Sequence, residues 1–128
     1  MKINNLLIGA VALFVLPLGN SFPQNAKSLA KSGDLAFKEG DFYNAAYFYK
    51  RSLGIDSSKL DVVYLYAEAC RLSNNYKTAE RYYKKVFDAD RGQVQMFPQS
   101  QFWMGMVKKD QGKYADAKKM FKQYSGKH

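Results

Sequence analysis

The chain has 128 residues, of which 47% are hydrophobic and 16% aromatic, so it can bury the core of one small domain and is not a disordered chain. Its formal net charge of +9 suits acidic proteins, anionic membrane surfaces or nucleic acid, although solvation of a helical surface also explains the charge. One cysteine, Cys70, and one histidine, His128, exclude an internal disulfide and a Cys/His metal site.

The first 21 residues have the layout of a secretory signal peptide. Lys2 gives a positive start, an apolar run from Leu6 to Leu18 follows, and Gly19 and Ser21 are small residues two positions apart. An uncleaved membrane anchor is the weaker alternative, because a spanning helix needs about 20 apolar residues. We therefore predict cleavage after Ser21 and a mature domain over residues 22–128.

Four sets of positions then recur along the chain, with a first step of 34 residues and a second step of 38 in every set. Each set holds one kind of side chain, and the order is small, aromatic, alanine, aromatic. The sets are Gly33, Ala67 and Gly105; Phe42, Tyr76 and Tyr114; Ala45, Ala79 and Ala117; and Tyr49, Tyr83 and Phe121. A period near 34 with such anchors predicts helix–turn–helix repeats, which bury their apolar faces only by stacking.

The first predicted unit covers residues 26–57, with helices over about 25–38 and 42–53. Gly40 and Asp41 form the turn between them, and Asp41 is a suitable N-cap for the second helix. Phe42, Tyr49 and Leu53 share one face at helical spacing, which is typical of a buried stripe.

The second predicted unit covers residues 60–91, with Asn74 and Asn75 at its turn, since asparagine tolerates a left-handed backbone. Its expected inward residues are Val63, Tyr66, Ala67 and Cys70 on the first helix and Tyr76, Ala79, Tyr83, Val86 and Phe87 on the second.

The third predicted unit covers residues 97–124 and follows a loop lengthened by four residues. We expect Pro98 in the first turn of a helix, because its missing N–H needs no partner there. Gly112 and Lys113 form the turn. The expected inner face of the last helix is Tyr114, Ala117, Phe121 and Tyr124.

These repeating positions and turns resemble the tetratricopeptide repeat family over about residues 26–124. The resemblance implies an all-α fold, a right-handed superhelical array of three helix–turn–helix units, whose first helices line a concave groove that binds a protein or peptide. Matching positions give the groove candidates Lys27, Asp34, Phe37 and Lys38; Asp61, Tyr64, Glu68 and Arg71; and Gln99, Phe102, Met106 and Lys109. Plain solvated helix faces are the alternative for each of them.

Arrays of this kind usually end in an additional helix with a polar outer face. Only residues 125–128 follow Tyr124, so we expect the last helix to expose apolar surface, and Phe121 and Tyr124 to form a C-terminal interface. Two alternatives fit this expectation. Either the chain is a repeat fragment of a larger protein, or it is a structural oligomer that pairs through its last helix.

The resemblance and the signal peptide together predict an exported protein-interaction scaffold, periplasmic or associated with the outer membrane of a bacterial cell envelope. The chain is weakly similar to repeat segments of peptidoglycan-associated and type IX secretion-associated envelope proteins of Bacteroidetes-type bacteria. We predict no enzyme, no catalytic residue, no metal and no cofactor, because the carboxylates are scattered and no nucleophile or phosphate-binding motif occurs. Export also argues against nucleic acid as the partner.

Overall fold

The computed structural model describes residues 24–89 and 97–126, and within these ranges it is entirely helical apart from turns. The helices are α1 (Ala26–Lys38), α2 (Phe42–Ile55), α3 (Leu60–Leu72), α4 (Tyr76–Ala89), α5 (Ser100–Asp110) and α6 (Tyr114–Ser125). The predicted signal peptide and most of the lengthened loop before α5 lie outside the described residues.

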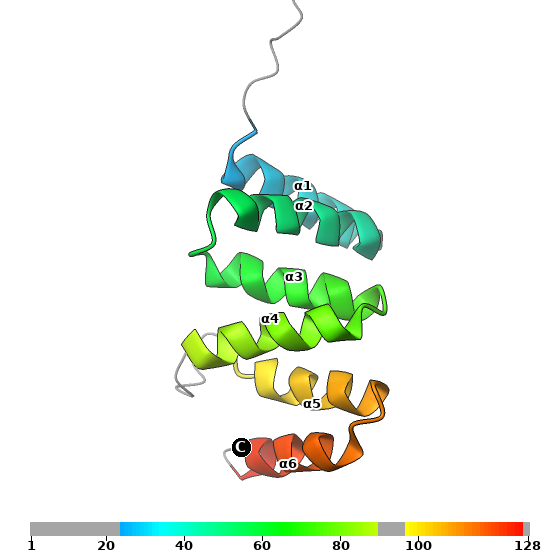
Figure 1. Ribbon diagram of the computed structural model, residues 1–128. Coiled ribbons are helices and arrows are strands. Elements are labelled where there is room, and N and C mark those ends of the chain that lie inside the picture. The colour runs from blue at the N-terminus through cyan, green and yellow to red at the C-terminus, as the bar shows by residue number, and fades with distance from the viewer. Residues whose placement is uncertain (1–23, 90–96, 127–128) are drawn as a thin grey trace, which may run out of the picture.

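The six helices form three pairs that stack in one direction from α1 to α6 (Figure 1). Each helix packs mainly on its neighbours in the chain, so α2 lies on both α1 and α3, and α4 lies on both α3 and α5. The predicted all-α helical repeat array is therefore confirmed. None of the helices in the described ranges is long and apolar enough to cross a membrane.

The turns within the pairs have the predicted geometry. Asp41 caps α2, because its carboxylate accepts a 3.1 Å hydrogen bond from the backbone N–H of Asn44. Asn74 has φ 63°, while Gly40 and Gly112 at the equivalent turns have φ 80° and 77°. An asparagine thus replaces glycine in a left-handed turn, as expected.

Close packing inside each pair explains the small residues. A Cβ placed on Gly33 would lie 2.6 Å from Cε1 of Tyr49, and one placed on Gly105 would lie 2.8 Å from Cε1 of Phe121. Both distances are far below van der Waals contact, so only glycine allows these rings to lie on the first helix. Ala45, Ala79 and Ala117 are buried at the equivalent positions of the second helices.

Two predictions about the third unit are wrong. Pro98 lies in the turn before α5 rather than in the helix, because the chain first makes a turn in which Ser100 N donates to Phe97 O at 3.0 Å. Tyr114 is 69% exposed instead of buried. Its equivalent Phe42 packs edge-on against Phe37, with ring centroids 5.1 Å apart, but in the third unit an exposed lysine takes the place of Phe37.

Units two and three are joined by a charged contact around Glu80 of α4. Its carboxylate accepts hydrogen bonds from Lys108 Nζ at 2.6 Å, Gln111 Nε2 at 2.6 Å and Lys113 Nζ at 2.9 Å. Burial alone would raise the pKa of Glu80, but these donors outweigh it and lower the pKa to about 2. Glu80 is thus ionised and holds α4 on α5 at neutral pH.

Candidate partner-binding surface

The predicted groove residues lie on α1, α3 and α5, the first helices of the three pairs, with Gln99 directly before α5. By the repeat spacing all of them except Lys38 fall into four columns that run across the stack, and Ala30 completes one column. The columns are Lys27, Asp61 and Gln99; Ala30, Tyr64 and Phe102; Asp34, Glu68 and Met106; and Phe37, Arg71 and Lys109. Side chains of one column come from the first helices of successive units, so each column holds the equivalent position of α1, α3 and α5.

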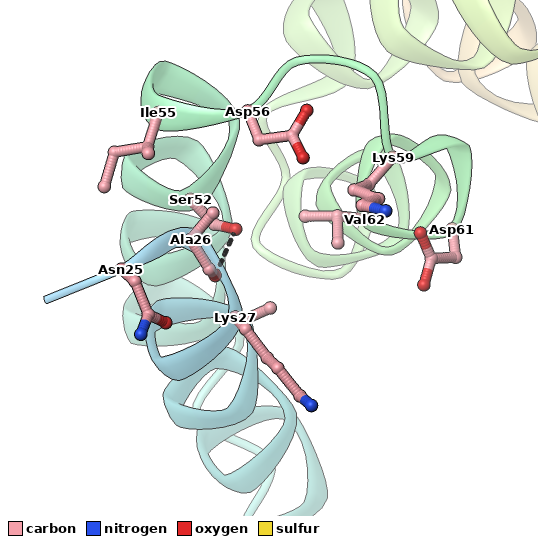
Figure 2. A pocket seen from close by; sticks show the side chains of 10 residues that line it. Asn25, Ala26, Lys27, Ser52, Ile55, Asp56, Lys59, Asp61 and Val62 are labelled. Atoms are coloured by element: carbon pink, nitrogen blue, oxygen red, sulfur yellow. Dashed lines mark hydrogen bonds between the residues drawn. The ribbon is translucent and has the colours of Figure 1, made fainter.

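At the N-terminal end of this surface, Lys27 and Asp61 line a hollow of about 660 Å³ between α1, the end of α2 and the start of α3. Figure 2 shows their side chains and the hydrogen bond of 2.7 Å that Ser52 Oγ donates to the carbonyl of Ala26. That bond ties the end of α2 to the start of α1. The hollow is lined by Asn25, Ala26, Lys27, Ala30, Ser52, Ile55, Asp56, Lys59, Asp61 and Val62.

At the centre of the surface, three polar side chains form a closed network. Arg71 Nη2 lies 2.9 Å from Glu68 Oε2, and Arg71 Nε donates a 3.1 Å hydrogen bond to the hydroxyl of Tyr83. The Tyr83 hydroxyl in turn donates to the other carboxylate oxygen of Glu68. Both charged side chains are less than one fifth exposed, so the ion pair is partly desolvated. The network fixes Arg71 instead of leaving it free to rearrange.

Aromatic rings flank this network. The Arg71 guanidinium carbon lies 3.8 Å from the ring centroid of Trp103 on α5, which is a close cation–π contact. Tyr64 stacks on Phe97 with centroids 4.8 Å apart and an interplanar angle of 19°, and it meets Tyr83 edge-on. The centre therefore combines flat apolar rings with one oriented cation.

The surroundings shift the ionisation of these groups. Burial, reinforced by the charge of Glu68, raises the pKa of Tyr64 to about 12 and raises the pKa of Tyr83 further. Burial alone would lower the pKa of Arg71, but its hydrogen bond and attraction to Glu68 outweigh this and raise the pKa. Both phenols are therefore neutral donors, and Arg71 is a permanent cation.

The first unit has a related contact, since the hydroxyl of Tyr49 donates a 2.8 Å hydrogen bond to Asp34. Tyr49 and Asp34 are the equivalents of Tyr83 and Glu68. In the third unit both partners are apolar, because Phe121 and Met106 stand at those positions. The candidate surface thus becomes more apolar from α1 to α5.

Phe121 and Tyr124 contact α5 rather than projecting away from it. Their ring centroids lie 5.7 and 5.6 Å from that of Phe102, and both rings are half-buried. The expectation that α6 exposes apolar surface is wrong for most of the helix. Its exposed residues are mainly polar: Asp116, Lys118, Lys119, Lys122, Gln123 and Ser125, with Tyr114 and Ala115 at its start.

The remaining groove candidates are placed separately from the central network. Phe37 is half-buried against Phe42, whereas Lys38 and Lys109 are exposed at the ends of α1 and α5. Gln99 is the N-cap residue of α5 but makes no capping hydrogen bond through its side chain.

Sequence reasoning missed three contributors to the surface: the hydroxyl of Tyr83, the ring of Trp103 and the ring of Phe97. The sequence predicts Tyr83 on an inner face, and Phe97 and Trp103 lie within the predicted third unit. The signal for Tyr83 was present, because tyrosine and a carboxylate recur together at equivalent positions in the first two units.

Residues 60–93 match the family model of the tetratricopeptide repeat. The match takes in α3 and α4 and therefore the central network itself. Tetratricopeptide repeats are protein-interaction units, whose stacked first helices form extended binding surfaces. The other two helix pairs place Gly33 against Tyr49 and Gly105 against Phe121, at the positions that Ala67 and Tyr83 hold in the matched pair. No curated protein matches the sequence of this chain.

Proposed function

We propose that this chain is an exported protein–protein interaction scaffold of the bacterial cell envelope, in which the first helices bind a segment of a partner protein. The observation that carries the proposal is the central network, where Glu68 holds Arg71 against the ring of Trp103 and Tyr64 packs on Tyr83. Oriented arginine and aromatic side chains supply much of the affinity of protein interfaces.

The arrangement favours a partner segment with an apolar or aromatic anchor and a nearby carboxylate or backbone carbonyl. Tyr64 and Phe102 occupy equivalent positions on the first helices of units two and three and supply rings for the anchor. Arg71 is already paired, so a partner carboxylate would share its remaining N–H donors rather than replace Glu68.

Crosslinking in intact cells tests the surface. A photoreactive residue at Tyr64 or Phe102 should capture one discrete partner, whereas the same residue at Tyr43 should not. Tyr43 is a matched control because it is 78% exposed on α2, a second helix outside the candidate surface. Arg71→Glu should abolish the crosslink from Tyr64. Equal capture from all three sites, or no effect of Arg71→Glu, would contradict the proposal.

Export rests on the signal-peptide pattern of residues 1–21 and is tested independently. Cells that express the full chain should yield a mature protein beginning at Phe22 in the envelope fraction, as determined by mass spectrometry. Recovery of a protein that retains Met1 to Leu18 in the cytoplasmic fraction would refute export while leaving the binding surface untouched.

A further inference from the structure

The two junctions between units bring equivalent positions together. At the junction of units two and three, Glu80 of α4 meets Lys108 of α5, together with Gln111 and Lys113 of the turn that follows α5. Glu80 is therefore the contacting position, on the second helix of a unit. Lys108, Gln111 and Lys113 are the three receiving positions, on the unit that follows.

The junction of units one and two brings together the four equivalent positions, none of which is charged, and Lys50 lies beside them. A hollow of about 280 Å³ there is lined by Ala46 of α2 together with Cys70, Ser73 and Asn75 of unit two. By the repeat spacing, Ala46 is the equivalent of Glu80, and the other three are the equivalents of Lys108, Gln111 and Lys113. Stacking of one unit on the next therefore brings this set of positions to the same junction.

In unit one the three receiving positions lie on and just after α1, and the structure describes no helix before α1. Leu35 of α1 is 59% exposed, although its equivalents Ala69 and Val107 are fully buried. Beside it lies a hollow of about 270 Å³ that includes Ala36, Glu39 and Asp41, the equivalents of the three receiving positions. The positions that lie against a second helix at the inner junctions are therefore at the surface on this face of α1.

In unit three the position equivalent to Glu80 lies on α6. Lys118 stands at the position of Glu80, with Lys119 and Lys122 on the same side of the helix, and all three are exposed. The equivalents of Lys122 are Lys50 and Lys84, so a lysine at that position is compatible with a stacked junction.

The exposed faces of α1 and α6 are complementary in charge. Compared with the junction of units two and three, the acidic and basic sides are exchanged. Lys118 replaces the acidic Glu80, while Glu39 and Asp41 replace Gln111 and Lys113. We propose that copies of this chain associate head to tail, with α6 of one copy stacked on α1 of the next and Lys118 beside Glu39 and Asp41. Leu35 would be covered in the process, as its equivalents already are within the chain.

Such an interface is heterologous, because two different faces meet, and it leaves one free face of each kind at the ends of the assembly. It differs from pairing of α6 with itself, which would bring lysines of like charge together. It also goes beyond the proposed partner binding, since neither Lys118 nor Glu39 belongs to the candidate groove.

Sedimentation and light scattering of the protein purified from cells expressing the full chain test the proposal. The average mass should rise with protein concentration and fall at high salt, because exposed charges contribute to the contact. Glu39→Lys and Lys118→Glu should each weaken association about tenfold, as expected when an attractive charge pair becomes repulsive. Lys77→Glu on the exposed side of α4 makes the same charge change as Lys118→Glu. It is the control for that variant and should not weaken association.

The decisive experiment measures the average mass of the two variants mixed in equal amounts. Glu39→Lys and Lys118→Glu protein each self-associate weakly, but in a mixture Lys118 of the first variant meets Glu39 and Asp41 of the second, as in the original chain, so association should recover. A protein that stays monomeric up to about 1 mM would overturn the proposal. Failure of the mixture to recover assembly would overturn it as well. Circular dichroism verifies that both variants fold, and groove crosslinking should be unchanged in each.

Discussion

The hydroxyl of Tyr49 donates a 2.8 Å hydrogen bond to the carboxylate of Asp34, across the two helices of the first unit. The second unit has the corresponding bond from Tyr83 to Glu68. In the third unit phenylalanine and methionine replace both partners together. Hydroxyl and carboxylate therefore occur as a pair, and the pair links the packing within a unit to the polar side chains on the candidate surface.

These two bonds predict unequal effects of the same substitution. Tyr49→Phe should lower the free energy of unfolding by about 1 kcal/mol, because Asp34 is exposed and water replaces the lost donor. Tyr83→Phe should cost about 2 kcal/mol, because the partly buried Glu68 and Arg71 each lose one hydrogen bond. Urea unfolding measures both, with Tyr43→Phe as an exposed control. Equal losses at the two sites would contradict the closed network.

Three glycines predict opposite responses to alanine. Gly33→Ala and Gly105→Ala should destabilise the chain by about 1–3 kcal/mol each, because the new methyl group would overlap Tyr49 or Phe121. Gly54→Ala in α2 meets no atom within 4 Å and should stabilise it by up to about 1 kcal/mol through higher helix propensity. Thermal unfolding followed by circular dichroism distinguishes the signs. Stabilisation by Gly33→Ala would show that the ring can move aside.

The contacts within a unit could be predicted from the sequence, whereas several contacts between units could not. Gly33 with Tyr49 and the cap at Asp41 depend on spacing inside one helix pair, which the period makes visible. The contact of Arg71 with Trp103 depends on how one pair is rotated against the next, and no period encodes that rotation. The burial predicted for Tyr114 is wrong, and at the position where Phe37 packs on Phe42 in the first unit the third unit has Lys109.

Burial should make Cys70 unreactive. Its thiol lies in the core and its pKa is raised to about 11, mainly by loss of hydration. Near pH 8 the thiolate fraction should be roughly 100-fold lower than in the unfolded chain, so alkylation should be slower by at least that factor. Mass spectrometry after iodoacetamide treatment, with and without urea, measures the ratio. Rapid alkylation of the native protein would show that α3 opens locally.

Trp103 is the single tryptophan of the chain and reports on the central network. Arg71→Leu removes the guanidinium from its ring face, so we expect a change in Trp103 fluorescence intensity at unchanged helix content. Arg51→Leu, which removes a comparable contact with Tyr47, is the control and should leave the Trp103 spectrum as it is. A spectrum that is insensitive to Arg71→Leu would show that the two side chains are not in contact in solution.

The contacts of Glu80 predict how stability depends on pH. Its pKa in the folded chain is lowered to about 2 from an ordinary value near 4.5, so the folded state favours the ionised form. The resulting stability is fully present above pH 4.5 and is lost progressively as the pH falls towards 2. A shift of this size corresponds to at most about 3 kcal/mol, and screening at the exposed Lys113 reduces our expectation to about 2 kcal/mol.

Glu80→Gln tests this dependence. At pH 7 the variant should be less stable than the original chain by about 2 kcal/mol, and the difference should vanish near pH 2, because protonated Glu80 and glutamine are both neutral. Asp88→Asn is the matched control, since its ion pair with Lys84 is more than half exposed on both sides and should contribute less than about 0.5 kcal/mol. Urea unfolding at several pH values measures the two differences. A constant difference between the original chain and Glu80→Gln from pH 7 to pH 2 would show that the carboxylate charge does not hold α4 on α5.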